Sequence, residues 1–147
     1  MSYVSATDVQ ERLGDTLYVE LTDDTGSGSA DLDKINEAIQ GAEGEVNSYV
    51  GLRYVVPVDL TGQSVIAEVL KSFVLDLVEQ RLHGRRPPVP EDIRRKRSEA
   101  LTWLKRVADG EIVLPSSSAV PRSAEADIPG KPVGTPRRFT RDELSSL

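Results

Sequence analysis

Residues 64–84 read SVIAEVLKSFVLDLVEQRLHG, and this stretch decides the fold. On a helix of 3.6 residues per turn, its Val, Ile, Leu and Phe side chains cover well over half of the circumference. The remaining strip is polar and consists of Glu68, Ser72, Asp76 and Glu79. The charged residues Glu68, Lys71, Asp76 and Glu79 recur too often for a helix that spans a bilayer, where each charge near the middle costs about 3 kcal/mol. The stretch therefore predicts a central helix of a soluble domain, covered on several sides by other elements.

Two further helices are expected to pack against this central one. Residues 31–50 begin with an Asp suited to a helix cap and carry apolar residues at alternating spacings of 3 and 4. Residues 91–109 follow Pro90 and place acids near the positive end of the helix dipole. We therefore predict a mainly α fold, a small helical bundle with a central helix at about 64–83 packed by helices at about 31–50 and 91–109.

The segments between these helices are expected to be short. Residues 5–13 form a first helix, and residues 15–22 a connector pinned by apolar side chains. The pinning residues are Leu17, Val19 and Leu21. Residues 52–63 form an extended crossing in which Tyr54, Val56 and Val58 alternate, because Pro57 forbids a helix there.

Residues 22–30, TDDTGSGSA, predict a flexible loop. Counted from Asp23, the loop superficially matches a calcium-binding loop, with Thr25 and Ser27 at ligand positions. The twelfth position is Lys34, where a bidentate Glu is needed, so the usual oxygen cage does not close. The pattern therefore favours turn and helix-cap chemistry over metal binding.

Three residues indicate close contacts. Gly41 and Gly44 lie inside a predicted helix at a cost of about 1 kcal/mol each relative to Ala, which suggests that another backbone approaches there. That backbone belongs to the central helix or, as the less favoured alternative, to a neighbouring subunit. Trp103 lies at the edge of the apolar stripe of residues 91–109 and either covers its own core or contacts another subunit.

Composition divides the 147 residues into a helical domain, 1–114, and a Pro/Ser-rich tail, 115–147. The absence of cysteine excludes disulfides and thiolate metal sites and fits a reducing cytoplasm.

The charges are unevenly distributed along the chain. Residues 1–63 carry 12 acids and 3 bases, whereas residues 64–114 carry 8 acids and 10 bases. This asymmetry reflects either solvated helix faces or a head-to-tail contact between subunits, and the acidic total argues against a general nucleic-acid binder.

The end of the tail carries a motif of its own. Thr140 and Glu143 form a Thr-x-x-Glu capping box, and Phe139 and Leu144 stand at the spacing of a hydrophobic staple. The 24-residue linker before this motif spans about 27 Å as a random coil. The motif, which Leu147 completes, is therefore expected to dock on a neighbour or partner, or else to fold back on its own domain.

The sequence contains no recognisable catalytic motif. The only histidine, His83, stands near the C-terminus of the central helix, where positive charge is favoured. The sequence shows no nucleophile motif, no phosphate-binding glycine loop and no metal-ligand spacing. We therefore expect no catalytic, cofactor or metal site and a protein that is not an enzyme.

Several segments together resemble one family. They are SYVSATDVQERLG (2–14), LTDD (21–24), I-x-x-A-I-x-x-A-x-x-E-V-x-x-Y (35–49), RYVVPV (53–58), RLHG-R (81–85), A-L-x-W-L-x-x-V-A-x-G (100–110) and RRFTRDEL (137–144). In this order and spacing they resemble the small neck proteins of Mu-like phages and prophages, in the head-tail connector or head completion group of long-tailed phages.

The resemblance implies a helical virion protein, made in the cytoplasm of the bacterial host, that forms a twelve-fold head-to-tail ring at the head–tail junction. Such a ring docks on the portal protein and joins it to the downstream neck, stopper or tail protein, while DNA passes through without specific binding. The residues expected to dock on partners or subunits are Phe139, Thr140, Arg141, Glu143, Leu144, Leu147 and Trp103, and the loop 22–30 is expected to order on assembly.

An acidic surface within residues 31–45 is the expected lining of the DNA channel, because a conduit should not hold phosphates. Its members are Asp31, Asp33, Glu37, Glu43 and Glu45. The alternative function is a monomeric adaptor or regulatory binding module that acts through the C-terminal motif and involves neither membrane nor cofactor.

Overall fold

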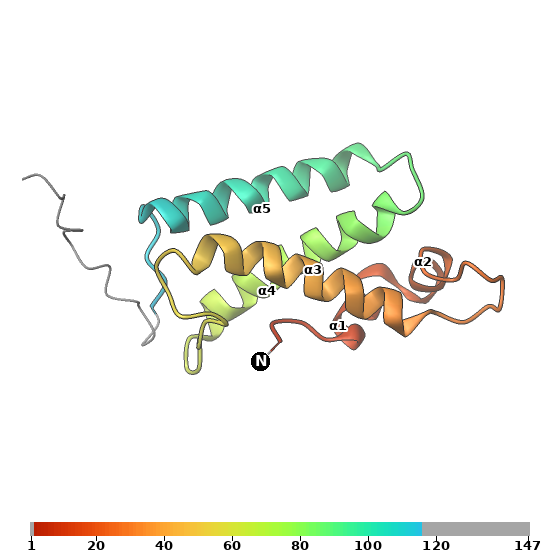
Figure 1. Ribbon diagram of the computed structural model, residues 1–147, viewed down its shortest axis with the longest axis horizontal. Helices are drawn as coiled ribbons and strands as arrows, with labels where there is room; N and C mark the ends of the chain where they lie inside the picture. Colours follow the sequence, from red (N-terminus) through yellow and green to blue (C-terminus); the bar gives the residue numbers. More distant parts are fainter. Residues whose placement is uncertain (1, 116–147) are drawn as a thin grey trace, which may run out of the picture.

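The computed structural model describes residues 2–115, and helix α4 (Ser64–Gly84) runs through the middle of them (Figure 1). Helices α3 (Leu32–Val50) and α5 (Glu91–Asp109) pack on α4 and on each other, and α1 (Ala6–Leu13) packs on α3 and α4. The short helix α2 (Asp15–Glu20) follows α1 directly. The described part contains no β-strand, so the predicted mainly helical bundle is confirmed.

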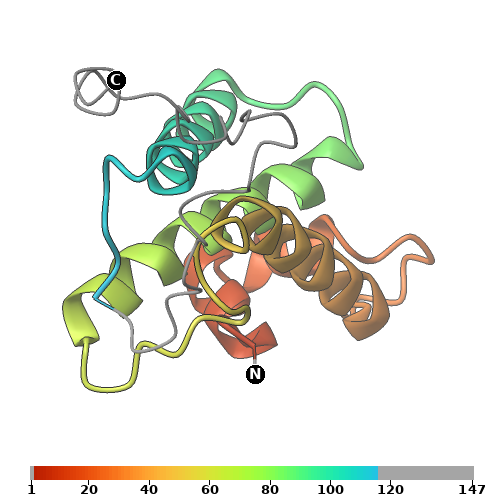
Figure 2. The same ribbon diagram turned by 60° about the vertical axis from the view of Figure 1, so that its left-hand side comes forward.

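Helix α4 is the central element that its sequence predicts. Residues 74–78 are five consecutive buried positions, and successive helical residues point about 100° apart, so these five side chains point all the way round the helix. Other elements therefore cover this part of α4 on every side (Figure 2). One of the five is Asp76, which belongs to the polar strip that the sequence predicts. Asp76 is buried there, and Arg12 of α1 pairs with it.

The core forms where α3 and α5 meet α4. Helix α3 contributes Ile35, Ala42 and Val46, and α5 contributes Ala100 and Leu104, all fully buried. Apolar spacing along each helix places these side chains on one face, as the sequence predicts. Leu32 departs from the pattern, because the buried face of α3 begins one turn later and Leu32 remains exposed.

Helix α2 replaces the connector that was expected at residues 15–22. Tyr18 and Leu21 are buried, whereas Leu17 is exposed, so the inward side chains are three residues apart, as on a helix, rather than alternate. The fully buried Thr22 then donates its hydroxyl hydrogen bond to the Tyr18 carbonyl at 2.7 Å. Of the three predicted pinning residues, Leu21 is buried, but Leu17 is not, because a short helix turns Tyr18 inward instead.

The crossing from α3 to α4 has two anchors. Tyr54 and Val58 are buried as predicted, and Val58 donates its backbone hydrogen bond to the Tyr3 hydroxyl at 2.9 Å. The Tyr54 hydroxyl accepts from the backbone N–H of Leu114 at 2.7 Å. Val56, expected to point inward, remains exposed. The predicted tail lies outside the described residues except for Pro115.

Candidate interaction surfaces

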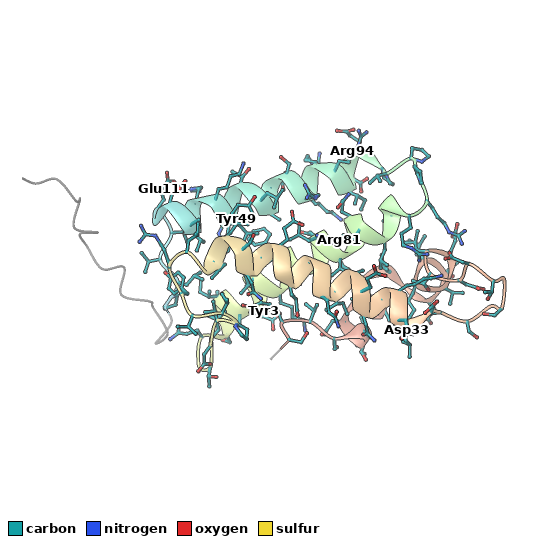
Figure 3. All side chains as sticks on the ribbon, in the orientation of Figure 1. Tyr3, Asp33, Tyr49, Arg81, Arg94 and Glu111 are labelled. Atoms are coloured by element: carbon teal, nitrogen blue, oxygen red, sulfur yellow. The ribbon has the colours of Figure 1, made fainter. Side chains whose placement is uncertain are left out.

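One carboxylate joins the three long helices. Glu45 of α3 pairs with Arg81 of α4 at 3.0 Å and with Arg97 of α5 at 2.7 Å. Figure 3 shows Arg81 between α3 and α5. Glu45 is largely shielded from water, and this shielding strengthens each attraction compared with a pair on the open surface. The bundle is therefore held by charge at this point as well as by its apolar core.

Arg81 also explains Gly41. A Cβ at Gly41 would stand 2.8 Å from Nη1 of Arg81, so a side chain, rather than the predicted backbone, approaches this glycine. At Gly44 nothing in the described part of the chain lies within 4 Å of a Cβ. The favoured expectation of close approach by the central helix was therefore wrong at both glycines, because α4 reaches α3 here through a long side chain.

A second charged cluster lies between α1, α4 and α5. Arg12 donates a hydrogen bond to Asp76 and lies 3.7 Å from Glu79, which is also 3.7 Å from Lys96. Burial raises the pKa of Asp76, and the positive charges of Arg12 and Lys96 oppose that rise. The buried Oε2 of Glu79 accepts no hydrogen bond from any described residue. Arg12 and Lys96 thus compensate charges that α4 carries into the interior.

The loop of residues 22–30 is organised by Asp23. Its carboxylate accepts hydrogen bonds from the backbone N–H groups of Gly28 at 2.7 Å, Thr25 at 3.0 Å and Ser27 at 3.1 Å. These bonds, that from Gly28 first, hold the pKa of Asp23 far below its usual range. Turn chemistry was predicted for this loop, and the structure confirms it.

The same loop is attached to the end of α4. Arg85 donates to the Leu21 carbonyl at 3.0 Å and pairs with Asp24 at 2.6 Å, and Arg86 donates to the Asp23 carbonyl at 2.9 Å. The loop therefore has a defined position within a single chain. The prediction of a flexible loop overlooked these arginines, which are remote in sequence, and ordering of the loop on assembly stays a prediction.

The five acids predicted to line a channel have different environments. Asp31 caps α3 by accepting from the Asp33 and Lys34 N–H groups, and Glu43 accepts from the Tyr3 N–H at 2.6 Å. Glu45 joins the helices as described above. Of these five, only Asp33 and Glu37, one helical turn apart on α3, are exposed without an ion pair to any described residue. Figure 3 shows Asp33 near the start of α3. The structure thus leaves two of the five acids fully available to a partner.

The four consecutive bases of α5, residues 94–97, point in different directions around the helix. Arg94 pairs with Glu91, and Arg95 lies 3.8 Å from Glu99, all on the exposed side of α5. Figure 3 shows Arg94 pointing away from the bundle. Lys96 and Arg97 turn inward to the two clusters described above. The four bases therefore form no single patch.

Trp103 covers its own core. Its ring lies against Phe73 of α4, with centroids 4.9 Å apart and ring planes at 41°. This contact is one of the two alternatives that the sequence left open, and a subunit contact through the exposed part of the ring stays a prediction. The other predicted docking residues lie outside the described residues: Phe139, Thr140, Arg141, Glu143, Leu144 and Leu147.

An exposed aliphatic surface, which the sequence did not predict, lies at the end of the bundle where α3 and α5 terminate. We call it the aliphatic end and define it by Leu52, Val55, Val56 and Val113. Leu52 is 65 % exposed, Val55 57 % and Val113 74 %. The sequence offered one signal for this surface. Successive side chains of an extended segment point to opposite sides, so an inward Tyr54 predicts an outward Val55.

Comparison with known protein families gives one match. The model of the family described as Bacteriophage Mu, Gp36 matches residues 3–129, most of the chain. The chain belongs to the bacteriophage Mu Gp36 family. The resemblance to Mu-like phage proteins is thereby confirmed. A search of curated proteins found no match.

The Gp36 family match spans all five helices of residues 2–115, so the family model covers the whole bundle described above. The C-terminal motif at 139–147 lies beyond the matched region. Within residues 2–115 of this Gp36 family member, no three His, Asp or Glu side chains form a group that could hold a metal ion. No helix of the described part is long and apolar enough to cross a membrane.

Proposed function

We propose that this Gp36 family protein is a structural protein of the virion of a Mu-like phage and that it makes and breaks no bonds. Its copies form a head-to-tail, twelve-fold ring at the head–tail junction, which docks on the portal and joins it to the downstream neck or tail component. The observation that carries this proposal is the family match over all five helices. It supports a phage particle component, and the resemblance of the sequence to neck proteins adds the position.

The bundle suits a load-bearing ring subunit. Its helices are fixed to one another by a continuous apolar core and by the Glu45 and Asp76 clusters. Docking between preformed surfaces costs little ordering entropy, which favours repeated assembly of identical copies. The loop 22–30, held by Arg85 and Arg86, offers such a preformed surface at one end of the bundle.

Asp33 and Glu37 are the acids best placed to face DNA. Both lie on one exposed side of α3 and form no ion pair with any described residue. A ring that turns this side inward presents repeated negative charge to the phosphates, so the passing DNA is not held. Glu43 and Glu45 support the wall by holding the N-terminal segment and the other helices.

Light scattering after size-exclusion chromatography tests the proposal, with the protein alone and mixed with the portal protein of the same phage. We expect a complex that contains both proteins at equal subunit numbers. A strict monomer that ignores the portal would contradict the proposal and favour the adaptor alternative. A chain ending at residue 138 keeps the whole bundle, so loss of binding in that variant alone would assign portal docking to the C-terminal motif.

A further inference from the structure

The aliphatic end is a built surface rather than a loose one. Arg53 donates to the carbonyls of Ala108 at 3.0 Å and Asp109 at 3.2 Å, and Leu114 donates to the Tyr54 hydroxyl at 2.7 Å. These three bonds join residues 52–56 to residues 108–114, side by side. The buried side chains of Tyr54 and Leu114 anchor the two segments in the core, so the surface has a fixed shape.

On both segments, a buried residue stands directly beside an exposed one. Tyr54 and Leu114 are buried, whereas their neighbours Val55 and Val113 point outward. Five of the seven large exposed aliphatic side chains of the described residues lie on the 52–56 segment, on residue 113 or at the start of α4. Figures 1 and 2 both place the 110–115 segment beside the start of α4. Exposed aliphatic side chains gathered in this way mark a contact surface.

A cavity of about 240 Å³ lies between the N-terminal segment, residues 57–61 and the start of α4. Tyr3, residues 57–60 and Ala67 line it together with the polar Glu68 and Lys71. The cavity is large enough for one aromatic side chain, and its mixed lining suits an apolar group flanked by charged ones.

The length and exit point of the remaining chain identify the occupant. Pro115, the last described residue, follows directly on the aliphatic end, and residues 116–147 continue from it. Phe139, Leu144 and Leu147 are the large apolar residues of the final nine. A random coil as long as the 24 residues of 115–138 would span about 27 Å and give an effective concentration in the millimolar range at its own aliphatic end.

We propose that the aliphatic end binds residues 139–147 of the same chain. Phe139, Leu144 and Leu147 are the apolar residues with which this segment would make the contact. At micromolar protein, the tethered segment outcompetes both a second copy and an unrelated partner for this surface. The inference concerns the free chain and goes beyond the proposed function, because it holds whether or not the protein forms a ring. In an assembling ring, the segment must leave its own chain before it docks elsewhere.

Cross-linking tests the proposal, because the native chain contains no cysteine. The test variant carries Ser64→Cys, at the start of α4, and Ser145→Cys. The control carries Ser29→Cys with Ser145→Cys, because Ser29 lies in the exposed loop at the opposite end of the bundle (Figure 1). A bismaleimide of about 10 Å, added at 1 μM protein, should link the test pair within a monomer at least about fivefold more than the control pair.

Two single substitutions then test the surfaces separately. Phe139→Ser and the exposed-site change Val113→Lys should each reduce the yield of the test pair to that of the control. Equal yields for the two pairs, or a yield unaffected by Phe139→Ser, would overturn the proposal. A product found only as covalent dimers, including dimers from mixed single-cysteine variants, would also overturn it and name a second copy as the occupant.

Discussion

Asp76 is a carboxylate on the central helix with almost no access to water. Its raised pKa has burial as its first cause, which means that the fold disfavours the ionised form. Arg12 and Lys96 offset this cost from two different helices. Loss of Arg12 should therefore cost more stability than neutralisation of Asp76. Without Arg12 the charge of Asp76 stays buried and loses its partner, whereas neutral Asp76 leaves no buried charge.

Arg12→Ala should destabilise the protein by about 2–3 kcal/mol at pH 7, and Asp76→Asn by less than about 1 kcal/mol. Urea unfolding of the two variants measures both values. Because the pKa of Asp76 is raised in the fold, protonation favours the folded state, and Arg12→Ala should regain stability as the pH falls through that pKa. A larger loss from Asp76→Asn than from Arg12→Ala would contradict this account.

The pKa of Asp8 is lowered in the fold, whereas that of Asp76 is raised. The hydrogen bond from Lys71, followed by those from Ser5, lowers the pKa of Asp8 from 3.8 to about 2. A depressed folded pKa stabilises the protein above the unfolded value, and this contribution is lost as the pH falls from about 4 to about 2. Solvent screening limits it to about 1 kcal/mol, since Lys71 is one-third exposed.

Asp8→Asn should therefore lower stability at pH 6 and have little effect at pH 2. Thermal unfolding across that range measures the difference. Lys71→Met removes the first cause of the shift and should flatten the pH dependence in the same way. A constant difference between the native chain and Asp8→Asn at all pH values would show that Asp8 acts through packing instead.

At the scale of the helix, Gly44 of α3 is a glycine for which the described part of the chain gives no steric reason. Nothing described lies near a Cβ at Gly44, and Ala is the better helix former, so Gly44→Ala should stabilise the isolated protein by about 0.5–1 kcal/mol. Gly41→Ala should lose that gain because Arg81 must move away from Glu45. Urea unfolding compares the two variants.

Light scattering of the Gly44→Ala variant then addresses the subunit alternative. A variant that is more stable as a monomer but fails to form the ring would place a neighbouring subunit against α3. Destabilisation by Gly44→Ala in the monomer would contradict the open environment of this residue.

The loop 22–30 depends on the end of α4. Arg85→Ala removes the bonds to Leu21 and Asp24, so limited proteolysis within the loop should accelerate several-fold while the unfolding midpoint changes little. Arg94→Ala, which breaks an exposed pair on α5, serves as the matched control and should leave the cleavage rate unchanged. Equal cleavage rates in both variants would show that Asp23 alone fixes the loop.

The elements that sequence predicted well are those whose apolar spacing and caps agree locally. Residues 64–84 and the Asp31 cap of α3 are examples. The features that the sequence did not reveal at Asp76, Gly41 and the loop have a shared cause, which is that a remote charged side chain alters each environment. Arg12, Arg81 and Arg85 are far from their partners in sequence, and no local pattern contains such pairings.

At the scale of the molecule, the bundle has two dissimilar ends. One end carries the polar loop 22–30, and the other carries the aliphatic end from which the chain continues (Figure 1). Different ends suit a subunit that contacts different partners above and below a ring, and the exposed acids of α3 lie between them. The docking residues at 139–147 stay a prediction, because they lie outside the described residues.

The central claim is that this Gp36 family chain is a ring component of the phage neck. A density map of the neck in purified virions tests it most directly. The account predicts the α3–α4–α5 bundle repeated around the axis directly beneath the portal, with Asp33 and Glu37 facing the channel. Virions that lack this polypeptide, or that carry it away from the head–tail junction, would contradict the claim.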